Sequence, residues 1–505
     1  MQRRHLLTAL ASLPLWPLAA RANPHAHHGM PAPASTPAAP APVARQPLSG
    51  GASLREPARL ANQSGKPAGR FAGTLTMVET RHALLPGEPT WLWTYNGSVP
   101  GPVIELTAGD QVSLTLRNRL AESTTVHWHG LPVAPEFDGH PRQAIAPGND
   151  FVACWQLPAD WYGTYWYHPH PHGRTARQAA MGLAGAVLVR DPADPLAGLP
   201  ESLLVISDQR FDTGNQVAAH TLADWMDGRE GDVVLVNGQH RPRLTVAPGE
   251  TRRLRVVNAC AARYLRLAVS GARLVRVASD GGWLPAPQPV EDYLLVPGER
   301  SEFVVTFPHH AGTPLTLVSL PYARQKMMSP EQTAPVPLLD IGISSGREPA
   351  ASFTLPATLR PVVPLGTPVR RREIVLDERP HDMAAHAGHA MADPQRMVEG
   401  LFLIDGKTYD MERVDLEARV GEVEAWEVVN RSHMDHPFHL HGGRFQLVAI
   451  DGRPVTPTWR DTVNLPPRSR LTLLTRFDHP GELLYHCHVL EHEDAGMMAT
   501  LRVRA

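Results

Sequence analysis

The feature that most constrains the fold of this chain is a strand pattern that occurs three times. Residues 108–118, 248–258 and 420–430 each combine a glycine turn, an alternation of apolar and polar residues, and a terminal asparagine. Side chains of a strand alternate between its two faces, so each copy predicts a strand with one buried face. Three copies of one pattern predict three copies of one structural unit.

Each repeated strand is followed by a second strand pair around a glycine turn, at Gly163, Gly312 and Gly481. The chain also holds 50 prolines and 40 glycines, which favour short strands joined by turns over long helices. The sequence therefore predicts an all-β fold of three consecutive Greek-key β-sandwich domains. The expected boundaries are residues 55–192 for the first domain, 193–350 for the second and 365–505 for the third.

The first 22 residues predict an export signal, because Arg3 and Arg4 precede an apolar stretch and residues 20–22 resemble a cleavage site. The paired arginines resemble a twin-arginine signal, which carries folded cargo across the inner membrane; an ordinary Sec signal is the alternative. Residues 23–54 are rich in proline and alanine and predict a disordered tether. We therefore expect a periplasmic protein.

The charge balance argues against two classes of partner. Lys and Arg number 48 against 50 Asp and Glu, a net charge of −2, so neither nucleic acid nor an anionic membrane is expected to bind. Outside the export signal no apolar run approaches the length of a membrane span, so no stable membrane insertion is expected. The protein is expected to be a monomer.

Cys154 and Cys260 are predicted to be buried, and the sequence leaves open whether a disulfide bridge joins them.

Four blocks of closely spaced histidines carry the strongest functional signal. One His-x-His pair is a weak signal, but four such blocks, two near residue 150 and two near residue 460, do not arise easily by chance. The blocks hold His127 and His129; His168, His170 and His172; His436, His439 and His441; and His486, Cys487, His488 and His492. They lie in the first and third copies of the repeat, so the middle domain is predicted to hold the outer two in contact.

Strand geometry sorts these residues into two sites. If the blocks are strands, His486 and His488 face one way and Cys487 faces the other. In residues 436–441 the last two histidines share a face, and His436 lies on the opposite one. This predicts two sites built back to back, one containing Cys487 and His436. The other gathers the paired histidines, which requires the first domain to dock on the third.

The first site can be completed by His492 and, beyond a glycine, by Met497. Two imidazoles, one thiolate and a weak axial thioether are the ligand set of blue-copper electron-transfer sites, and zinc is the rival metal. The second site holds eight histidines and could bind two or three metal ions with positions left open for a small molecule. Because Cys487 is bonded to His486 and His488 along the backbone, one site can pass electrons to the other. Dioxygen, which needs four electrons, is the natural acceptor.

Together these blocks resemble those of the three-domain multicopper oxidases over nearly the whole chain from about residue 55, with the bacterial laccase-like and cuprous-oxidase members the most similar. The resemblance implies cupredoxin-like domains and four copper ions per chain. It implies a type 1 copper at His436, Cys487, His492 and Met497, a type 2 copper at His127 and His439, and a type 3 pair at His129, His168, His170, His441, His486 and His488. His172 and His433 are left without a role and are expected to be exposed.

Two acidic residues match proton relays of this family. Asp138 follows His129 by nine residues, and Glu493 comes directly after His492. A carboxylate beside a buried cluster can have a pKa suited to proton transfer. A surface carboxylate or loop cap is the alternative for each.

The reducing substrate is less well defined. Cuprous-oxidase relatives carry a methionine-rich insert and a substrate-copper site, and residues 381–397 occupy the corresponding region here. Thioethers prefer Cu(I), so this segment could recruit copper, or it could be a polar surface loop. Ser432 stands where those relatives place an aspartate, which leaves an intact substrate-copper site in doubt. The candidate substrate-copper residues are Met383, Met391, Met397 and Met434.

Three functions follow from this reading. The first is a copper-tolerance oxidase that converts Cu(I) to Cu(II), with O2 as the second substrate. The second is a laccase-like oxidase of phenols and amines, and the two activities can coexist. The third class has no turnover and includes copper carriers, storage proteins and exported relatives that keep the fold as an interaction module.

Overall fold

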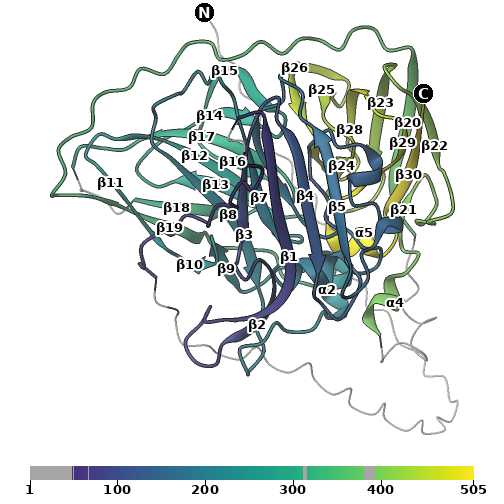
Figure 1. The fold of residues 1–505 in the computed structure, drawn as a ribbon, viewed down its shortest axis with the longest axis horizontal. Coiled ribbons are helices and arrows are strands. Elements are labelled where there is room, and N and C mark those ends of the chain that lie inside the picture. Colours follow the sequence, from purple (N-terminus) through teal and green to yellow (C-terminus); the bar gives the residue numbers. More distant parts are fainter. Residues whose placement is uncertain (1–47, 49, 66–67, 311–314, 380–392) are drawn as a thin grey trace, which may run out of the picture. The chain divides into compact units, whose positions relative to one another are not determined.

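The computed structural model describes residues 48, 50–65, 68–310, 315–379 and 393–505. These residues form three consecutive β-sandwiches, which confirms the all-β prediction (Figure 1). In Figure 1 the first sandwich is purple to blue, the second teal, and the third green to yellow. Gly312, Met383 and Met391 lie outside the described residues.

The first sandwich packs a four-stranded sheet, in the order β2-β1-β4-β5, against a three-stranded sheet, β3-β7-β6. Its core holds apolar side chains from both sheets, including Leu114 and Tyr167, together with the loop residue Trp128. Its elements are β1 (Arg70–His82), β2 (Thr90–Tyr95), β3 (Gly101–Thr107), β4 (Gln111–Asn118), η1 (Pro135–Phe137), η2 (Pro141–Gln143), β5 (Asp150–Gln156), β6 (Gly163–Tyr167), α1 (Thr175–Ala180) and β7 (Gly185–Arg190).

The second sandwich packs a seven-stranded sheet, β10-β9-β8-β12-β17-β14-β15, against a five-stranded sheet, β11-β19-β18-β13-β16. Its elements are β8 (Glu201–Gln209), α2 (Leu222–Asp227), β9 (Val233–Val236), β10 (Gln239–His240), β11 (Arg243–Val246), β12 (Thr251–Asn258), β13 (Leu265–Val269), β14 (Leu274–Ser279), β15 (Gly282–Val290), β16 (Tyr293–Leu295), β17 (Arg300–Thr306), β18 (Leu315–Leu320) and β19 (Val336–Ile343).

The third sandwich packs a six-stranded sheet, β21-β20-β23-β28-β25-β26, against a five-stranded sheet, β22-β30-β29-β24-β27. Its elements are β20 (Arg370–Glu378), α4 (Pro394–Val398), β21 (Phe402–Ile404), β22 (Leu416–Arg419), β23 (Val423–Asn430), β24 (His436–Leu440), β25 (Phe445–Ile450), β26 (Arg453–Arg460), β27 (Thr462–Leu465), β28 (Arg470–Arg476), β29 (Gly481–Cys487), α5 (Leu490–Asp494) and β30 (Met498–Arg504).

The repeated strand occupies the same place in all three sandwiches. It forms β4, β12 and β23, and each of these pairs in parallel with the strand that opens its sandwich, β1, β8 or β20. On its other edge each pairs antiparallel with a later strand, β5, β17 or β28. The repeat in the sequence is therefore a repeat in topology.

The terminal asparagine of each repeat is buried and ties the end of its strand to a distant turn. Its Oδ1 accepts the main-chain N–H two residues later, and its Nδ2 donates to two main-chain carbonyl groups. The acceptors are Glu122 and Ile145 for Asn118, Arg263 and Leu295 for Asn258, and Met434 and Leu465 for Asn430. In the third sandwich this bonding fixes the loop that leads to His436.

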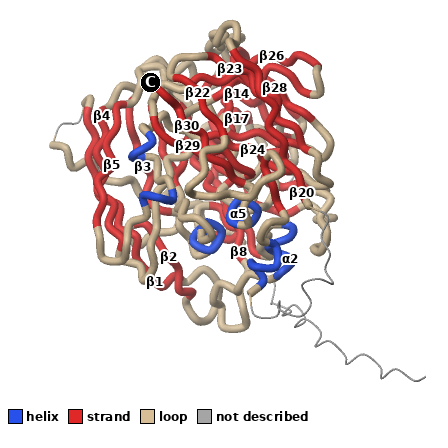
Figure 2. The backbone as a smooth tube through the Cα atoms, turned by 90° about the vertical axis from the view of Figure 1, so that its right-hand side faces the viewer, coloured by secondary structure: helices blue, strands red, loops and turns tan. Residues whose placement is uncertain are grey.

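The helices are short, and α2 and α5 lie close together in Figure 2 within a group of α-helices. Within this group α5 contacts α1 of the first sandwich and α2 of the second. The Asp494 carboxylate accepts hydrogen bonds from the Thr175 and Ala176 N–H groups, which docks α5 on the start of α1. Among the described residues, no helix combines the length and apolar character needed to span a membrane.

The prediction that Cys154 is buried is wrong. Cys154 is exposed on β5, while its neighbours Ala153 and Trp155 point into the core. The alternation of β5 therefore sets this thiol on the outer face of its strand. Cys260 is buried as expected, and both residues are free thiols in the structure.

Candidate metal centres

The first candidate centre brings together His436, Cys487 and His492, which are all fully buried. They come from the start of β24, the end of β29 and α5. The Cys487 Sγ lies 3.3 Å from His436 Nδ1 and 3.9 Å from His492 Nδ1, and the two Nδ1 atoms are 3.3 Å apart. Met497 is also fully buried, and its carbonyl accepts the Cys487 N–H.

The outer nitrogens of both rings are held by other groups, so their Nδ1 atoms face the thiol. His492 Nε2 donates to the Met226 carbonyl of the second sandwich, at 3.1 Å. His436 Nε2 donates to Ser432 Oγ at 2.9 Å and lies 3.3 Å from Glu378 Oε1. Such outer bonds orient metal-binding imidazoles. Two such nitrogens and a sulfur form a donor set that suits copper.

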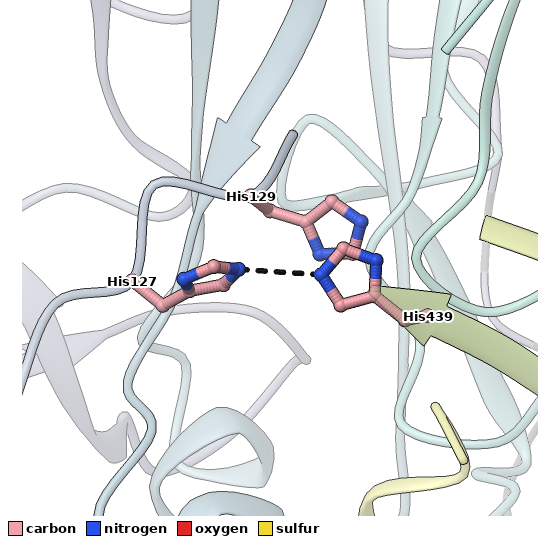
Figure 3. A group of neighbouring side chains, drawn as sticks. All are labelled: His127, His129 and His439. Carbon is pink, nitrogen blue, oxygen red and sulfur yellow. Dashed lines mark hydrogen bonds between the residues drawn. The ribbon is translucent and has the colours of Figure 1, made fainter. Parts of the chain in front are cut away.

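The second candidate centre is a cluster of eight histidines, each at most 3 % exposed. It lies between the first and third sandwiches, since four of the rings come from each. Figure 3 shows three of them, with the ring of His439 on β24 stacked on that of His129 and its edge turned toward His127. Three groups have ligand nitrogens within 4.8 Å of one another: His127, His129 and His439; His129, His168 and His488; and His170, His441 and His486.

The alternation of β24 and β29 separates the two centres. These strands pair antiparallel, with Phe438 opposite Cys487 and His439 opposite His486. Cys487 therefore belongs to the first centre, while His486 and His488 on either side of it belong to the second. One short backbone segment joins the two.

Most rings of the cluster are oriented by a hydrogen bond at Nδ1, which leaves Nε2 turned inward. The acceptors are main-chain carbonyls for His168, His439 and His486, and Asp138 for His127 and His441. The inward nitrogens then approach one another closely, as between His170 and His486 at 3.2 Å and between His441 and His486 at 3.1 Å. His129 is the exception, because its Nε2 bonds Asp461 Oδ1 at 3.0 Å and its Nδ1 faces inward.

Two further observations fit a metal in this cluster. Neither ring nitrogen of His488 has a hydrogen-bond partner among the described residues, although both are buried, and buried polar atoms normally have one. Burial lowers the pKa of His129, His168 and His488 well below the usual value, and that of His486 to about 3. Neutral rings are the form that binds metal.

The two predicted proton-relay residues both lie against the cluster. Asp138 is 2 % exposed and bridges two rings, with Oδ1 3.1 Å from His127 Nδ1 and Oδ2 3.0 Å from His441 Nδ1. Glu493 is 1 % exposed and lies 3.2 Å from His486 Nδ1 and 3.5 Å from His170 Nε2. Burial raises the pKa of both carboxyls, and in Glu493 the neighbouring Asp494 adds to the increase.

Two of the predicted substrate-copper methionines, Met397 and Met434, lie among the described residues. Met434 is fully buried in the core of the third sandwich, and Met397 is half-buried on α4. His172 and His433 are exposed as expected, but each has a neighbour. The His172 ring packs on Tyr409, and His433 Nδ1 bonds Glu378.

Glu378 is a residue that the sequence analysis missed. Its carboxylate contacts both His436, inside the first centre, and His433, at the surface. Glu378 and Ser432 both contact His436 Nε2, and Ser432 is the position at which the resemblance to cuprous oxidases implied an aspartate. The parallel pairing of β20 with β23, which recurs in every copy of the repeat, brings Glu378 to this position. Because the repeat in the sequence predicts this pairing, the position of Glu378 beside His436 could have been predicted from it.

Comparison with known proteins identifies the family of this chain. Family models described as multicopper oxidase match residues 77–194, 204–334 and 378–505. The multicopper oxidase mco of Staphylococcus aureus is 30% identical over 81% of this chain and 83% of its own. The structure of a multicopper oxidase from Campylobacter jejuni, described as a metallo-oxidase, is 38% identical over 91% of this chain and 96% of its own, with a TM-score of 0.85. The cell division protein FtsP of Escherichia coli is 29% identical over 89% of this chain and 92% of its own.

Proposed function

The chain belongs to the multicopper oxidases, copper-containing oxidoreductases that use O2, and we propose that it oxidises Cu(I), phenols or both at the Cys487 centre and reduces O2 at the eight-histidine cluster. Copper supplies the one-electron transfers and the binding of O2 when it is present. The residues proposed to hold four copper ions are His436, Cys487, His492 and Met497 for type 1; His127 and His439 for type 2; and His129, His168, His170, His441, His486 and His488 for the type 3 pair.

The observation that carries this proposal is the position of Cys487. Its side chain lies with His436 and His492, while the residues on either side, His486 and His488, belong to the other cluster. An electron that arrives at the Cys487 sulfur therefore has a continuous covalent route along the backbone into the cluster. A copper store needs no such connection.

Reduction of O2 to water also consumes protons, and two acids are placed to deliver them. Burial raises the pKa of Glu493, so its carboxyl, which lies against His170 and His486, keeps its proton to higher pH than a solvated glutamate does. Asp138 contacts His127 and His441 on another side of the cluster. We assign Glu493 as a proton donor and Asp138 as a second relay.

Glu378 supports Cu(I) as a reducing substrate. A carboxylate beside an imidazole that is 40% exposed, His433, offers a negative charge and a nitrogen donor that can hold a cation within reach of the His436 edge. An incoming Cu(I) ion held there would lie next to a ring of the Cys487 centre. A phenol needs only contact with that ring and no carboxylate.

Substituting Glu378→Gln separates the two substrates. We expect kcat/KM for Cu(I) to fall roughly tenfold or more, the effect of losing one contact to a charged group, with phenol oxidation little changed. Glu373→Gln is the matched control, since Glu373 lies on the same strand, is exposed and pairs with Arg431. An equal loss for both substrates would mean that Glu378 acts on His436 rather than on Cu(I).

Oxygen uptake tests the oxidase activity itself. The copper-loaded protein should consume O2 with Cu(I) and with a phenol, and Cys487→Ser should abolish both the intense blue absorption and the uptake. Deleting residues 381–397 should slow Cu(I) oxidation alone if that segment recruits copper. Absence of O2 uptake with both substrates would disprove the activity.

A non-catalytic role is the second candidate, favoured by the similarity to the cell division protein FtsP. The complete histidine and cysteine set argues against it, because an interaction module has no need for it. A protein that binds partners but neither holds copper nor consumes O2 would establish this alternative.

The cellular role follows from the substrate and the N-terminal sequence. Arg3 and Arg4 with the apolar stretch after them support export by the twin-arginine route, and a periplasmic Cu(I) oxidase would serve copper tolerance. We also propose a monomer. A strain lacking the gene should be copper-sensitive, and replacing the arginine pair by lysines should leave the protein in the cytoplasm.

A further inference from the structure

The second sandwich supplies none of the predicted copper ligands, yet it reaches the histidine cluster through the turn before β17. Gly298 in this turn has a φ of +82°, and a Cβ there would lie within 2.9 Å of the His488 ring. Arg300, the first residue of β17, is fully buried. The turn therefore lies directly against the cluster, which the role of a simple spacer does not require.

Arg300 forms a two-pronged ion pair with Asp461 of the third sandwich. Its Nη1 lies 2.6 Å from Asp461 Oδ1, its Nη2 contacts Oδ2, and both side chains are fully buried. Its Nε donates to the Thr164 carbonyl of the first sandwich, at 3.1 Å. A bidentate contact of this kind fixes the orientation of a carboxylate.

Asp461 in turn orients two predicted copper ligands. Its Oδ1 accepts a hydrogen bond from His129 Nε2 at 3.0 Å, and its main-chain carbonyl accepts one from His439 Nδ1 at 2.8 Å. The proton on Nε2 leaves Nδ1 of His129 as the nitrogen that faces His168. His129 is thus held in the tautomer opposite to that of the other oriented rings.

Space for this contact is provided by Gly130, which follows His129. Its φ is +85°, and a Cβ at this position would lie 2.3 Å from Asp461 Oδ2 and 2.5 Å from Arg300 Nη2. The carboxylate and the guanidinium therefore occupy the volume that a side chain would fill. The backbone beside His129 is shaped around the ion pair.

We propose that Arg300 is a positioning residue for the copper cluster: its two-pronged contact fixes Asp461 in the orientation that accepts the His129 Nε2 hydrogen bond and leaves Nδ1 of His129 free to bind copper. The inference rests on the proposed function, in which this cluster binds copper. Outer partners of metal-binding histidines of this kind change metal affinity 10–100-fold when they are removed.

The alternative is that the ion pair only joins the sandwiches. Breaking a buried ion pair destabilises a protein whatever its role, so a lower unfolding temperature does not distinguish the two. A selective loss of copper from the cluster does, because a purely structural contact would affect both copper centres through global unfolding alone.

The test compares Arg300→Met with Arg253→Met. Arg253 is also buried in the second sandwich and pairs with Glu302 on the neighbouring strand, so its loss breaks a similar ion pair away from the histidines. Each copper-loaded protein is titrated with a copper chelator, while copper per chain, the type 2 electron paramagnetic resonance signal and the blue absorption are followed. In Arg300→Met we expect cluster copper to leave at a chelator concentration about 10–100-fold lower, with the blue absorption unchanged. Arg253→Met should behave like the native protein.

Two results overturn the proposal: native retention of cluster copper by Arg300→Met, or an equal loss in Arg253→Met. If Arg300→Met does not fold, the double variant Arg300→Met/Asp461→Asn replaces it, because it leaves no unpaired charge. Native copper affinity in the double variant would also overturn the proposal. Failure of the proposed function looks different, since the native protein itself would then hold no type 2 copper.

Discussion

Glu493 shows how one buried side chain can link the chemistry of the cluster to the pH of the solution. Its carboxyl group touches the His170 and His486 rings and is 1 % exposed. Because burial raises its pKa well above the usual value, the protonated form persists to higher pH than in a solvated glutamate. The protonated form is the one that can donate.

Replacing this acid tests that role. Glu493→Gln keeps the shape but has no proton to give, so we expect the rate of O2 uptake to fall about 10²–10⁴-fold with copper content unchanged. In the native protein the rate should decline as the pH rises through the raised pKa of Glu493, and this limb of the pH profile should be absent in the variant. An unaltered rate in the variant would exclude Glu493 as the donor.

His140 gives a second residue-scale prediction, on stability. Burial lowers its pKa to about 4, and its Nδ1 accepts the Arg142 N–H, which requires a neutral ring. The unfolded chain binds a proton near pH 6.5 and the folded chain only near pH 4. The contribution of His140 to the free energy of unfolding, up to about 3 kcal/mol, is therefore fully present above pH 6.5 and is lost as the pH falls toward 4. His140→Asn should flatten the fall of the unfolding temperature over this range in the copper-free protein, and an unchanged slope would contradict the assignment.

At the scale of elements, the buried asparagine at the end of β4, β12 and β23 offers a matched set of variants. Each makes the same three hydrogen bonds, worth about 1 kcal/mol apiece, so replacing any of them by alanine should lower the unfolding temperature to a similar extent. Asn430→Ala should in addition weaken the blue absorption, because Asn430 fixes the loop before His436. Asn118→Ala and Asn258→Ala are its controls, and loss of the blue absorption in all three would refute a local effect.

The repeat also explains which elements could be predicted from sequence. Alternation of apolar residues is a local property, so β4, β12 and β23 and the opposite faces of Cys487 and His486 follow from the sequence pattern. Cys154 was misplaced because cysteine is among the most often buried residues, although here it shares its face of β5 with the exposed Asp150 and Gln156. The opposite face carries Ala153 and Trp155, which pack in the core.

At the scale of the whole molecule, the missed residues are those that act across sandwiches. Arg300 and Asp461 are 161 residues apart, and each is an ordinary charged residue in its own segment. Only docking of the three sandwiches brings them together beside His129. The histidine blocks could be predicted because each places several histidines within a few residues of one another. An ion pair between domains contributes only one charged residue to each segment, which is not an unusual pattern.

The distance along the chain between His127 and His439, 312 residues, sets the order in which the protein can be assembled. Contacts between such remote segments form late in folding, whereas each His-x-His block exists from the moment it is synthesised. Copper present too early would be captured by these local pairs in the unfolded chain and would stabilise it. We therefore expect the yield of active protein to be lower when copper is present during refolding than when it is added afterwards. Equal yields would show that early capture is harmless, and a higher yield with early copper would mean that the metal guides folding.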